Sequence, residues 1–172
     1  YDWIPYTLNP VDTDNTVDFH SAAYYLRYSN DLYVVRDYTS VAKNASDTNA
    51  SSVPLVTNRD NFDGQQAQLT TDTHNFIAKY PGILGNSLKV SFSGQGDTDY
   101  ANWAYKSYYD AAPGTSDFAT AAGATNDEAH VAVIDEDGTI TGTAGTVLET
   151  FPFVSIALGA KTSDGTSNYI LN

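Results

Sequence analysis

Hydrophobic residues recur over residues 17–28 at positions i, i+3, i+4 and i+7, which is the spacing of one face of a helix. The residues in this pattern are Phe19, Ala22, Ala23 and Leu26. Asn30 follows the pattern, and asparagine tolerates the left-handed conformation that ends many helices. Residues 32–36 are apolar, with aromatic and β-branched side chains, except for the final arginine, so they favour a short strand. The sequence therefore predicts a helix, a stop at Asn30 and a strand.

A second pattern alternates apolar and polar residues, as in a strand with one buried face. Residues 87–93 show it, with Leu88, Val90 and Phe92 on one side. Residues 129–156 read as two strands joined by the polar turn Asp135-Glu-Asp-Gly138, in which Gly138 is free to take a positive φ. These segments predict a strand and a β-hairpin.

The remaining segments carry weaker patterns. Residues 58–69 favour a helix, and residues 99–112 suit either a helix or a strand because aromatic residues are so dense there. Residues 168–171 begin a further strand. We expect surface loop regions over 39–70 and 110–128, which are rich in small and polar residues. The whole predicts one α+β domain over residues 1–172, a mostly antiparallel β-sheet or sandwich flanked by a few short helices.

The composition and net charge of the chain limit the classes of partner that it is expected to bind. The net charge is −13 with only 8 basic residues, so neither nucleic acid nor an anionic membrane surface is an expected partner. There is no cysteine, which excludes disulfides and thiolate metal sites. The absence of methionine, even at position 1, predicts that the chain is an excised or processed fragment. No apolar run approaches the roughly 18 residues of a membrane span, and no signal peptide is visible.

Few residues in the sequence suggest a catalytic, metal-binding or modification site. The three histidines, His20, His74 and His130, lack the spacing of metal ligands, and no serine lies in a nucleophile-elbow motif. The acidic turn at residues 135–138 lacks the alternating ligands of a calcium loop. Asn44 and Asn49 each begin a glycosylation triplet, which we interpret as accidental in a Ser- and Asn-rich loop. We therefore expect no catalytic residue, no cofactor and no metal site.

Three motifs occur in a fixed order along the chain. In the first motif, the predicted helix leads into Asn30-Asp31 and the strand that ends at Arg36. In the second, the segment Ala78-x-x-Pro-Gly-x-x-Gly-Asn86 leads into the next predicted strand. In the third, the hairpin contains Val-x-Glu-x-Phe at residues 147–151 and is followed by Asn-Tyr-Ile at residues 168–170. In this order the motifs resemble the contractile tail sheath proteins of bacteriophages. The residues to which the resemblance gives a structural role are Asn30, Asp31, Arg36, Pro81, Gly82, Gly85, Asn86, Gly138, Glu149 and Tyr169.

This resemblance implies a structural virion protein without enzymatic activity. Sheath subunits form stacked hexameric rings around a tail tube, and their contraction drives the tube through the host envelope. Their N- and C-terminal arms add strands to neighbouring subunits. The chain would be a middle, outward-facing portion that lacks both arms and the tube-binding region. It would be a monomer on its own, with no membrane insertion, and would belong to the virion after assembly in the host cytoplasm.

Two other classes of function compete with this interpretation. A glycan-binding β-rich module would use an exposed Trp3 or Trp103 to stack on sugars. A hydrolase would place one histidine within hydrogen-bond reach of both a serine and a carboxylate. Each alternative makes a geometric prediction about named side chains.

Overall fold

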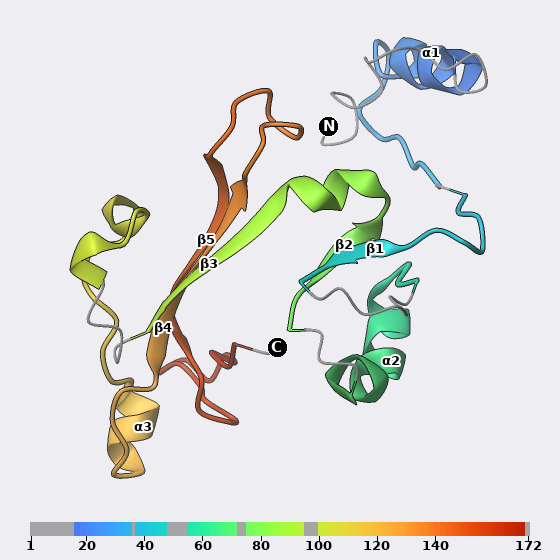
Figure 1. Ribbon diagram of the computed structural model, residues 1–172. Helices are drawn as coiled ribbons and strands as arrows, with labels where there is room; N and C mark the ends of the chain where they lie inside the picture. The colour runs from blue at the N-terminus through green and yellow to red at the C-terminus, as the bar shows by residue number, and fades with distance from the viewer. Residues whose placement is uncertain (1–15, 36, 48–54, 72–74, 95–99, 171–172) are drawn as a thin grey trace. The chain divides into compact units, whose positions relative to one another are not determined.

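The computed structural model describes residues 16–35, 37–47, 55–71, 75–94 and 100–170 (Figure 1). Its elements are two antiparallel sheets and short helices, which confirms the predicted α+β class. The contacts divide into two compact units: the first holds the described residues of Tyr1–Asn86 and Ile140–Gly142, and the second those of Ser87–Thr139 and Thr143–Asn172. That the whole chain folds as one domain stays a prediction.

The first unit contains a two-stranded antiparallel sheet in which Asn44 is the register partner of Pro81. Its elements are α1 (Thr16–Tyr25), β1 (Asn44–Ser46), α2 (Arg59–Thr71) and β2 (Ile77–Pro81), followed by the 3₁₀ helix η2 (Ile83–Ser87). The helix predicted over 58–69 is confirmed as α2. β1 lies in the region predicted to be loop, because three polar and small residues give no strand pattern.

Asn44 explains why so polar a segment forms a strand. Its side chain is buried, and Nδ2 donates to the carbonyl oxygens of Val56 at 2.9 Å and Ala78 at 2.7 Å. Its Oδ1 accepts from the backbone N–H of Val56 at 2.8 Å. One amide thus ties β1 to β2 and to the segment before α2, and the same bonds leave no room for a glycan on Nδ2. The interpretation that the triplet at Asn44 is accidental stays a prediction, with which the burial of its amide agrees.

The predicted helix over 17–28 is confirmed as α1, but it ends at Tyr25. Asn30 does not take the predicted left-handed conformation, since positive φ among described non-glycine residues occurs at Asn126 and Phe153. Instead, the backbone N–H of Ser29 bonds to the carbonyl of Tyr25, and the N–H of Asp31 bonds to Ser29 Oγ. A hydrogen-bonded turn therefore ends the helix.

The strand predicted over 32–36 is wrong in its described part. Residues 32–35 are extended, but they belong to neither sheet, and Arg36 lies outside the described residues. The apolar pattern was sufficient to predict an extended backbone. A strand also needs a neighbouring chain segment for its ladder, and none of the described segments pairs with this one.

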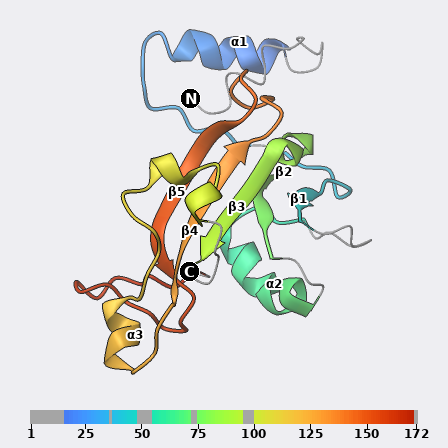
Figure 2. The ribbon, with the colours of Figure 1, turned by 60° about the vertical axis from the view of Figure 1, so that its left-hand side comes forward.

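The second unit is built on a three-stranded antiparallel sheet of order β3-β4-β5, and Figure 2 shows β4 between the other two strands. The strands are β3 (Leu88–Gly94), β4 (Glu128–Asp135) and β5 (Thr146–Ser155). The strand predicted over 87–93 and the hairpin predicted over 129–156 are both confirmed. Most of β4 is buried, including Ala129, Ala132 and Ile134, so the core of this unit lies along its central strand.

The hairpin connection is longer than the four-residue turn read from the sequence, and it runs over residues 136–145. The backbone N–H of Gly145 closes it by bonding to the carbonyl of Asp135 at 2.7 Å. Gly138 has φ +79°, as predicted, and a Cβ there would lie 2.6 Å from the backbone nitrogen of Ala144. Glycine is therefore required at this position both by the positive φ and by the close approach of the backbone.

Short helices cover the rest of the second unit: η3 (Tyr100–Asn102), η4 (Lys106–Tyr108) and α3 (Asp117–Ala121). The segment predicted over 99–112 as a helix or a strand thus contains, in its described part from residue 100 on, two 3₁₀ helices and neither an α-helix nor a strand. α3 lies within the predicted loop 110–128, and its N-cap is Ser116, whose Oγ accepts from the N–H of Ala119. The strand predicted over 168–171 is wrong in its described part, residues 168–170, because Tyr169 forms only an isolated bridge with Ser155. No helix in the described ranges is long and apolar enough to cross a membrane.

Candidate functional site

His130 lies at the centre of an aromatic cluster on one face of the three-stranded sheet. Its side chain is fully buried, and its ring stacks on that of Tyr109 with centroids 4.3 Å apart. Phe153 meets it edge to face at 4.6 Å. The cluster also includes Tyr100 and Trp103, which lie at 5.8 Å and 6.4 Å. Aromatic contacts of this kind stabilise beyond the apolar area that they bury.

Both ring nitrogens of His130 are bonded to backbone. Nδ1 accepts from the N–H of Phe153 at 3.1 Å, and Nε2 lies 2.8 Å from the carbonyl oxygen of Ala111. Because a backbone N–H can only donate, the proton of the neutral ring is on Nε2, which donates to Ala111. Neither nitrogen bonds to a serine or a carboxylate, so His130 lacks the arrangement that the hydrolase interpretation requires.

A β-bulge in β5 brings Phe153 into this cluster. Val131 pairs with Phe151 and Ala129 with Val154, so Pro152 and Phe153 together face His130. Phe153 has φ +52°, an uncommon conformation for a bulky residue. The bulge redirects its ring, and the hydrogen bond to His130 together with the edge-to-face contact holds the strained backbone in place.

A second buried polar group lies at the start of β4. Asp127 is buried, and its carboxylate accepts from the backbone N–H of Ser116 at 2.8 Å, from Ser116 Oγ at 2.6 Å and from Ser155 Oγ. Burial raises the pKa of Asp127, but the hydrogen bonds from Ser116 and Ser155 outweigh it and hold that pKa below its ordinary value. This carboxylate links the N-cap of α3 to the end of β5.

Acidic side chains also meet at the other end of β4. Ser87 Oγ contacts both Asp135, which is buried, and Asp137. Hydrogen bonds from Ser87 and Thr139 lower the pKa of Asp137. Within the described ranges, no three His, Cys, Asp or Glu side chains gather in a way that could hold a metal ion.

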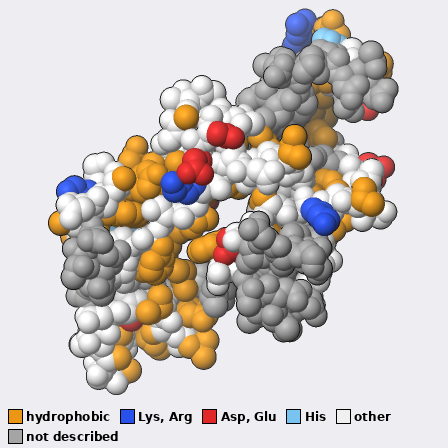
Figure 3. Space-filling view, viewed as in Figure 1, with side chains coloured by type: hydrophobic (Ala, Val, Ile, Leu, Met, Phe, Trp, Pro, Cys, Tyr) orange, Lys and Arg blue, Asp and Glu red, His pale blue; other side chains and the backbone are white. Residues whose placement is uncertain are grey.

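The opposite face of the sheet carries exposed aromatic side chains. Phe92 on β3 pairs with Val131 on β4, which pairs with Phe151 on β5, so the three lie in one row across the sheet. We call these three residues the aromatic row. Phe92 is 46% exposed and Phe151 43% exposed, while Val131 is buried between them. Figure 3 shows hydrophobic side chains gathered on the side of the molecule that holds this sheet and the segment after β5.

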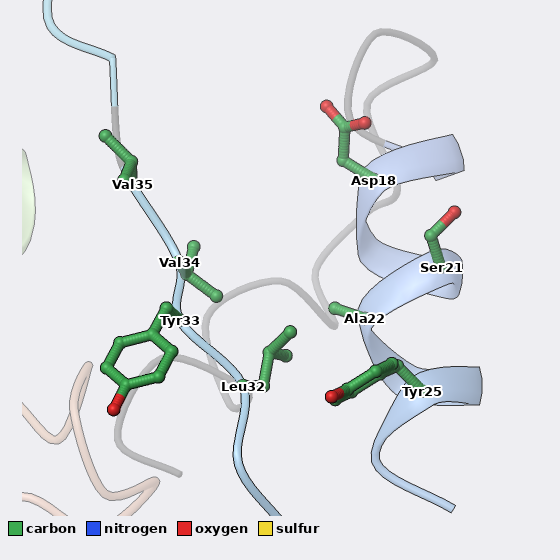
Figure 4. A pocket seen from close by; sticks show the side chains of 8 residues that line it. All are labelled: Asp18, Ser21, Ala22, Tyr25, Leu32, Tyr33, Val34 and Val35. Carbon is green, nitrogen blue, oxygen red and sulfur yellow. The ribbon is translucent and has the colours of Figure 1, made fainter. Parts of the chain in front are cut away.

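The first unit carries a shallow groove between α1 and the extended segment that follows it (Figure 4). Leu32 and Val34 point toward Ala22 and Tyr25 of the helix, and Tyr33 points away. α1 has no buried residue, and Val35 is 94% exposed. We call this feature the α1 groove; its lining residues are Asp18, Ser21, Ala22, Tyr25, Leu32, Tyr33, Val34 and Val35.

The structure distributes the motif residues over both units rather than bringing them to one place. Pro81 is buried at the end of β2, and Gly82 has φ +127° and donates its N–H to the carbonyl of Lys43 at 2.9 Å. Gly85 packs so tightly that a Cβ there would lie 2.8 Å from the Cβ atoms of Ala45 and Ala78. The others lie at exposed or half-buried positions: Asn30, Asp31, Asn86, Gly138, Glu149 and Tyr169.

The structure also shows where residues named by the glycan-binding and hydrolase interpretations lie. Trp103 is half-buried and its Nε1–H donates to Ser91 Oγ at 2.8 Å, so it is a packing residue rather than the exposed platform of the glycan-binding interpretation. His20 is exposed on α1 beside Phe19. Trp3 and His74 lie outside the described residues.

One relative comes from comparison with curated proteins. The chain is 29% identical over 140 residues to the tail sheath protein of Salmonella phage ViI. The match covers 80% of this chain and 19% of that protein, so the chain spans about a fifth of its relative's length. Neither the protein-family models nor the solved structures contain a match. The chain is thus distantly similar to a phage tail sheath protein, and this similarity supports a structural role in a phage.

Proposed function

We propose that this chain is part of a subunit of a contractile phage tail sheath, which polymerises around the tail tube and contracts to drive it through the host envelope. The observation that carries the proposal is the 29% identity to the sheath protein of Salmonella phage ViI over 80% of the chain. The ordered motifs at residues 30–36, 78–86 and 147–170 point to the same family independently of any one residue.

The described side chains support a role in assembly. The buried polar groups of Asn44, Asp127 and His130 bond to neighbours inside the fold. Large hydrophobic side chains remain on the surface of both units, and such surfaces suit contacts with other proteins. In this proposal the partners are other sheath subunits, the protein is not an enzyme and needs no cofactor, and it belongs to the virion after assembly in the host cytoplasm.

The test uses particles of the source virus and the reading frame that encodes this chain. Gold-labelled antibodies raised against residues 1–172 are expected to decorate the tail along its length in electron micrographs. The protein expressed from the whole reading frame is expected to form tubes. Antibody adsorbed with the purified chain is the control for labelling. Label confined to the capsid, the baseplate or the fibres would contradict the proposal.

A further inference from the structure

Strand β5 changes its register against β4 twice along its length. Residues 149–151 form the middle of the strand, and the pairs on either side of them are each one register step away from this middle segment. The first change leaves Leu148 without a partner in the β4–β5 ladder, and the second sets Pro152 and Phe153 together against His130. Burial of one face is what fixes the register of a strand, and the residues of the middle segment are all exposed.

We propose that the middle of β5 has a second register, one residue away, in which Phe151 replaces Phe153 beside His130. The sequence Phe151-Pro-Phe153 supplies a phenylalanine for this place in either register. A slip of one residue moves the middle segment by about 3.4 Å and turns each of its side chains to the other face. Phe153 has φ +52°, so the observed register carries backbone strain that lowers its advantage. This inference goes beyond the proposed function and does not rest on it.

The positions along β4 accept the slipped segment. Leu148 would move opposite Val133, where Glu149 lies now. Glu149 would move opposite Ala132, where Thr150 lies now. Both of these positions on β5 are exposed, so the carboxylate of Glu149 stays in water. The slip therefore buries no charge, and it gives Leu148 a partner on β4.

A slip in the opposite direction is disfavoured by burial. It would bring Glu149 opposite Ile134, which is 1% exposed, and into the half-buried position that Val147 holds now. A carboxylate that leaves water without gaining a partner is costly. The proposal therefore concerns one direction of slip, and the other direction provides a control.

Tyr109 stabilises the observed register. Its hydroxyl donates to the carbonyl oxygen of Val131 at 2.7 Å, and Val131 is the register partner of Phe151. Burial raises the pKa of Tyr109, and a hydrogen bond between its hydroxyl and the backbone of Phe151 opposes this rise. One hydroxyl thus joins two paired residues across the ladder. A slip carries Phe151 one residue away from Val131, so it breaks this connection.

The slip would change the surface of the sheet. In the observed register Phe92, Val131 and Phe151 form the aromatic row. After the slip, Thr150 would lie opposite Val131, and the ring of Phe151 would lie on the face that holds His130. The aromatic row therefore belongs to one register only, and the slip removes it while both ends of β5 stay paired.

The experiment is disulfide trapping in the whole chain, which has no cysteine of its own. Three double variants share Thr150→Cys. Adding Ala132→Cys reports the observed register, Val131→Cys the slipped register and Val133→Cys the opposite slip. Neighbouring side chains of a strand point to opposite faces, so a pair one residue out of register forms no disulfide unless the strand slips.

Each variant is diluted into the same glutathione buffer, and the intramolecular disulfide is followed by mass spectrometry of its peptides. We expect the slipped-register variant to react more slowly than the observed-register variant. We also expect it to react at least about tenfold faster than the opposite-slip variant. Equal rates for the slipped-register and opposite-slip variants would overturn the inference.

Tyr109→Phe tests the hydroxyl that joins the two strands. Added to the slipped-register variant, it is expected to raise the trapping rate at least about threefold, because the connection between Val131 and Phe151 is lost. A general loosening of the sheet would raise the rate of the opposite-slip variant as well. Tyr109→Phe is therefore added to that variant too, where we expect no change, and equal acceleration of both variants would contradict the proposal.

Phe153→Leu and Phe151→Leu make the same change on the two rings that exchange. In the slipped-register variant, Phe153→Leu is expected to raise the trapping rate, because it weakens the packing beside His130 in the observed register only. Phe151→Leu is expected to lower the rate, since it weakens the packing in the slipped register. A change in the same direction for the two variants would overturn the exchange.

Discussion

Phe153 donates its backbone N–H to Nδ1 of His130 at 3.1 Å, while its ring meets the imidazole edge to face at 4.6 Å. The two residues hold each other in unusual states: Phe153 has φ +52°, and His130 is a fully buried polar ring. The bond from Phe153 also decides which nitrogen of His130 carries the proton. This pair anchors the bulge of β5 to the central strand of the sheet.

His130→Phe keeps an aromatic ring of similar size but removes both hydrogen bonds. We expect a loss of about 2 kcal/mol in the free energy of unfolding, because the N–H of Phe153 loses its acceptor in a buried site. Hydrogen exchange of the β4 amides measures this loss within the second unit. His20→Phe, at an exposed position on α1, is the matched control and should leave those amides unchanged. Equal protection in the two variants would show that the hydrogen bonds of His130 contribute nothing.

Asp127→Asn tests the buried carboxylate. The pKa of Asp127 is lower in the folded chain than the ordinary value of about 3.9, so ionisation stabilises the folded state above that pH. This stabilisation is lost as the pH falls through the folded-state pKa. We expect the variant to be about 2 kcal/mol less stable at pH 7, with a difference that shrinks below about pH 4. Denaturant unfolding from pH 2 to pH 7 measures it, and a difference independent of pH would contradict the assignment.

Ser93→Ala is expected to be neutral or stabilising by up to about 1 kcal/mol. Ser93 is fully buried as the register partner of His130, and its Oγ has no hydrogen-bond partner among the described residues. Removing a hydroxyl that is desolvated without a partner removes a cost. Ser155→Ala is the contrast, since that hydroxyl donates to Asp127 and accepts from the N–H of Ala157, and we expect it to cost about 1 kcal/mol. Thermal unfolding of the two variants should shift in opposite directions.

Gly85→Ala and Gly64→Ala form a matched pair in the first unit. A Cβ at position 85 would lie 2.8 Å from the Cβ atoms of Ala45 and Ala78, so we expect a loss of about 1 to 3 kcal/mol. At position 64, inside α2, the new Cβ would have no atom within 4 Å apart from its chain neighbours and the helix's own backbone. Alanine there should stabilise by about 0.5 to 1 kcal/mol through helix propensity. Hydrogen exchange of the β2 amides reports the first change and helicity by circular dichroism the second. A Gly85→Ala chain as stable as the wild type would show that the close approach relaxes freely.

The parts of the fold that the sequence predicted are those governed by short-range periodicity. Helices α1 and α2, strand β3 and the β4–β5 hairpin all follow from apolar spacing within one segment. The wrong predictions each depended on contacts outside their own segment. Residues 32–35 have strand composition, but no described segment pairs with them, and residues 168–170 form only an isolated bridge, between Tyr169 and Ser155. Asparagine often ends a helix, but after α1 a hydrogen-bonded turn at Ser29 does so instead of Asn30.

The residues of the candidate sites also divide into those that the sequence could predict and those that it could not. Glu149 and Gly85 could be named from motifs, whereas no local pattern predicted the structural roles of Asn44 and Asp127 or the row that joins Phe92 to Phe151. Each of these depends on register between segments far apart in the chain: Asn44 reaches Ala78, and Ser155 reaches Asp127.

The sequence by itself determined the α+β class, the positions of the main elements, the acidic charge and the resemblance to sheath proteins, because these depend on composition and on spacing along the chain. Only the tertiary structure decided which polar residues are buried and what each one bonds to. It also decided that Leu32 to Val35 stay outside a sheet and that Phe153 turns toward His130. Burial and pairing depend on contacts between segments that are distant in the sequence. An unpaired polar group or strand edge costs free energy when it is buried, and whether it finds a partner depends on which segments pack against it.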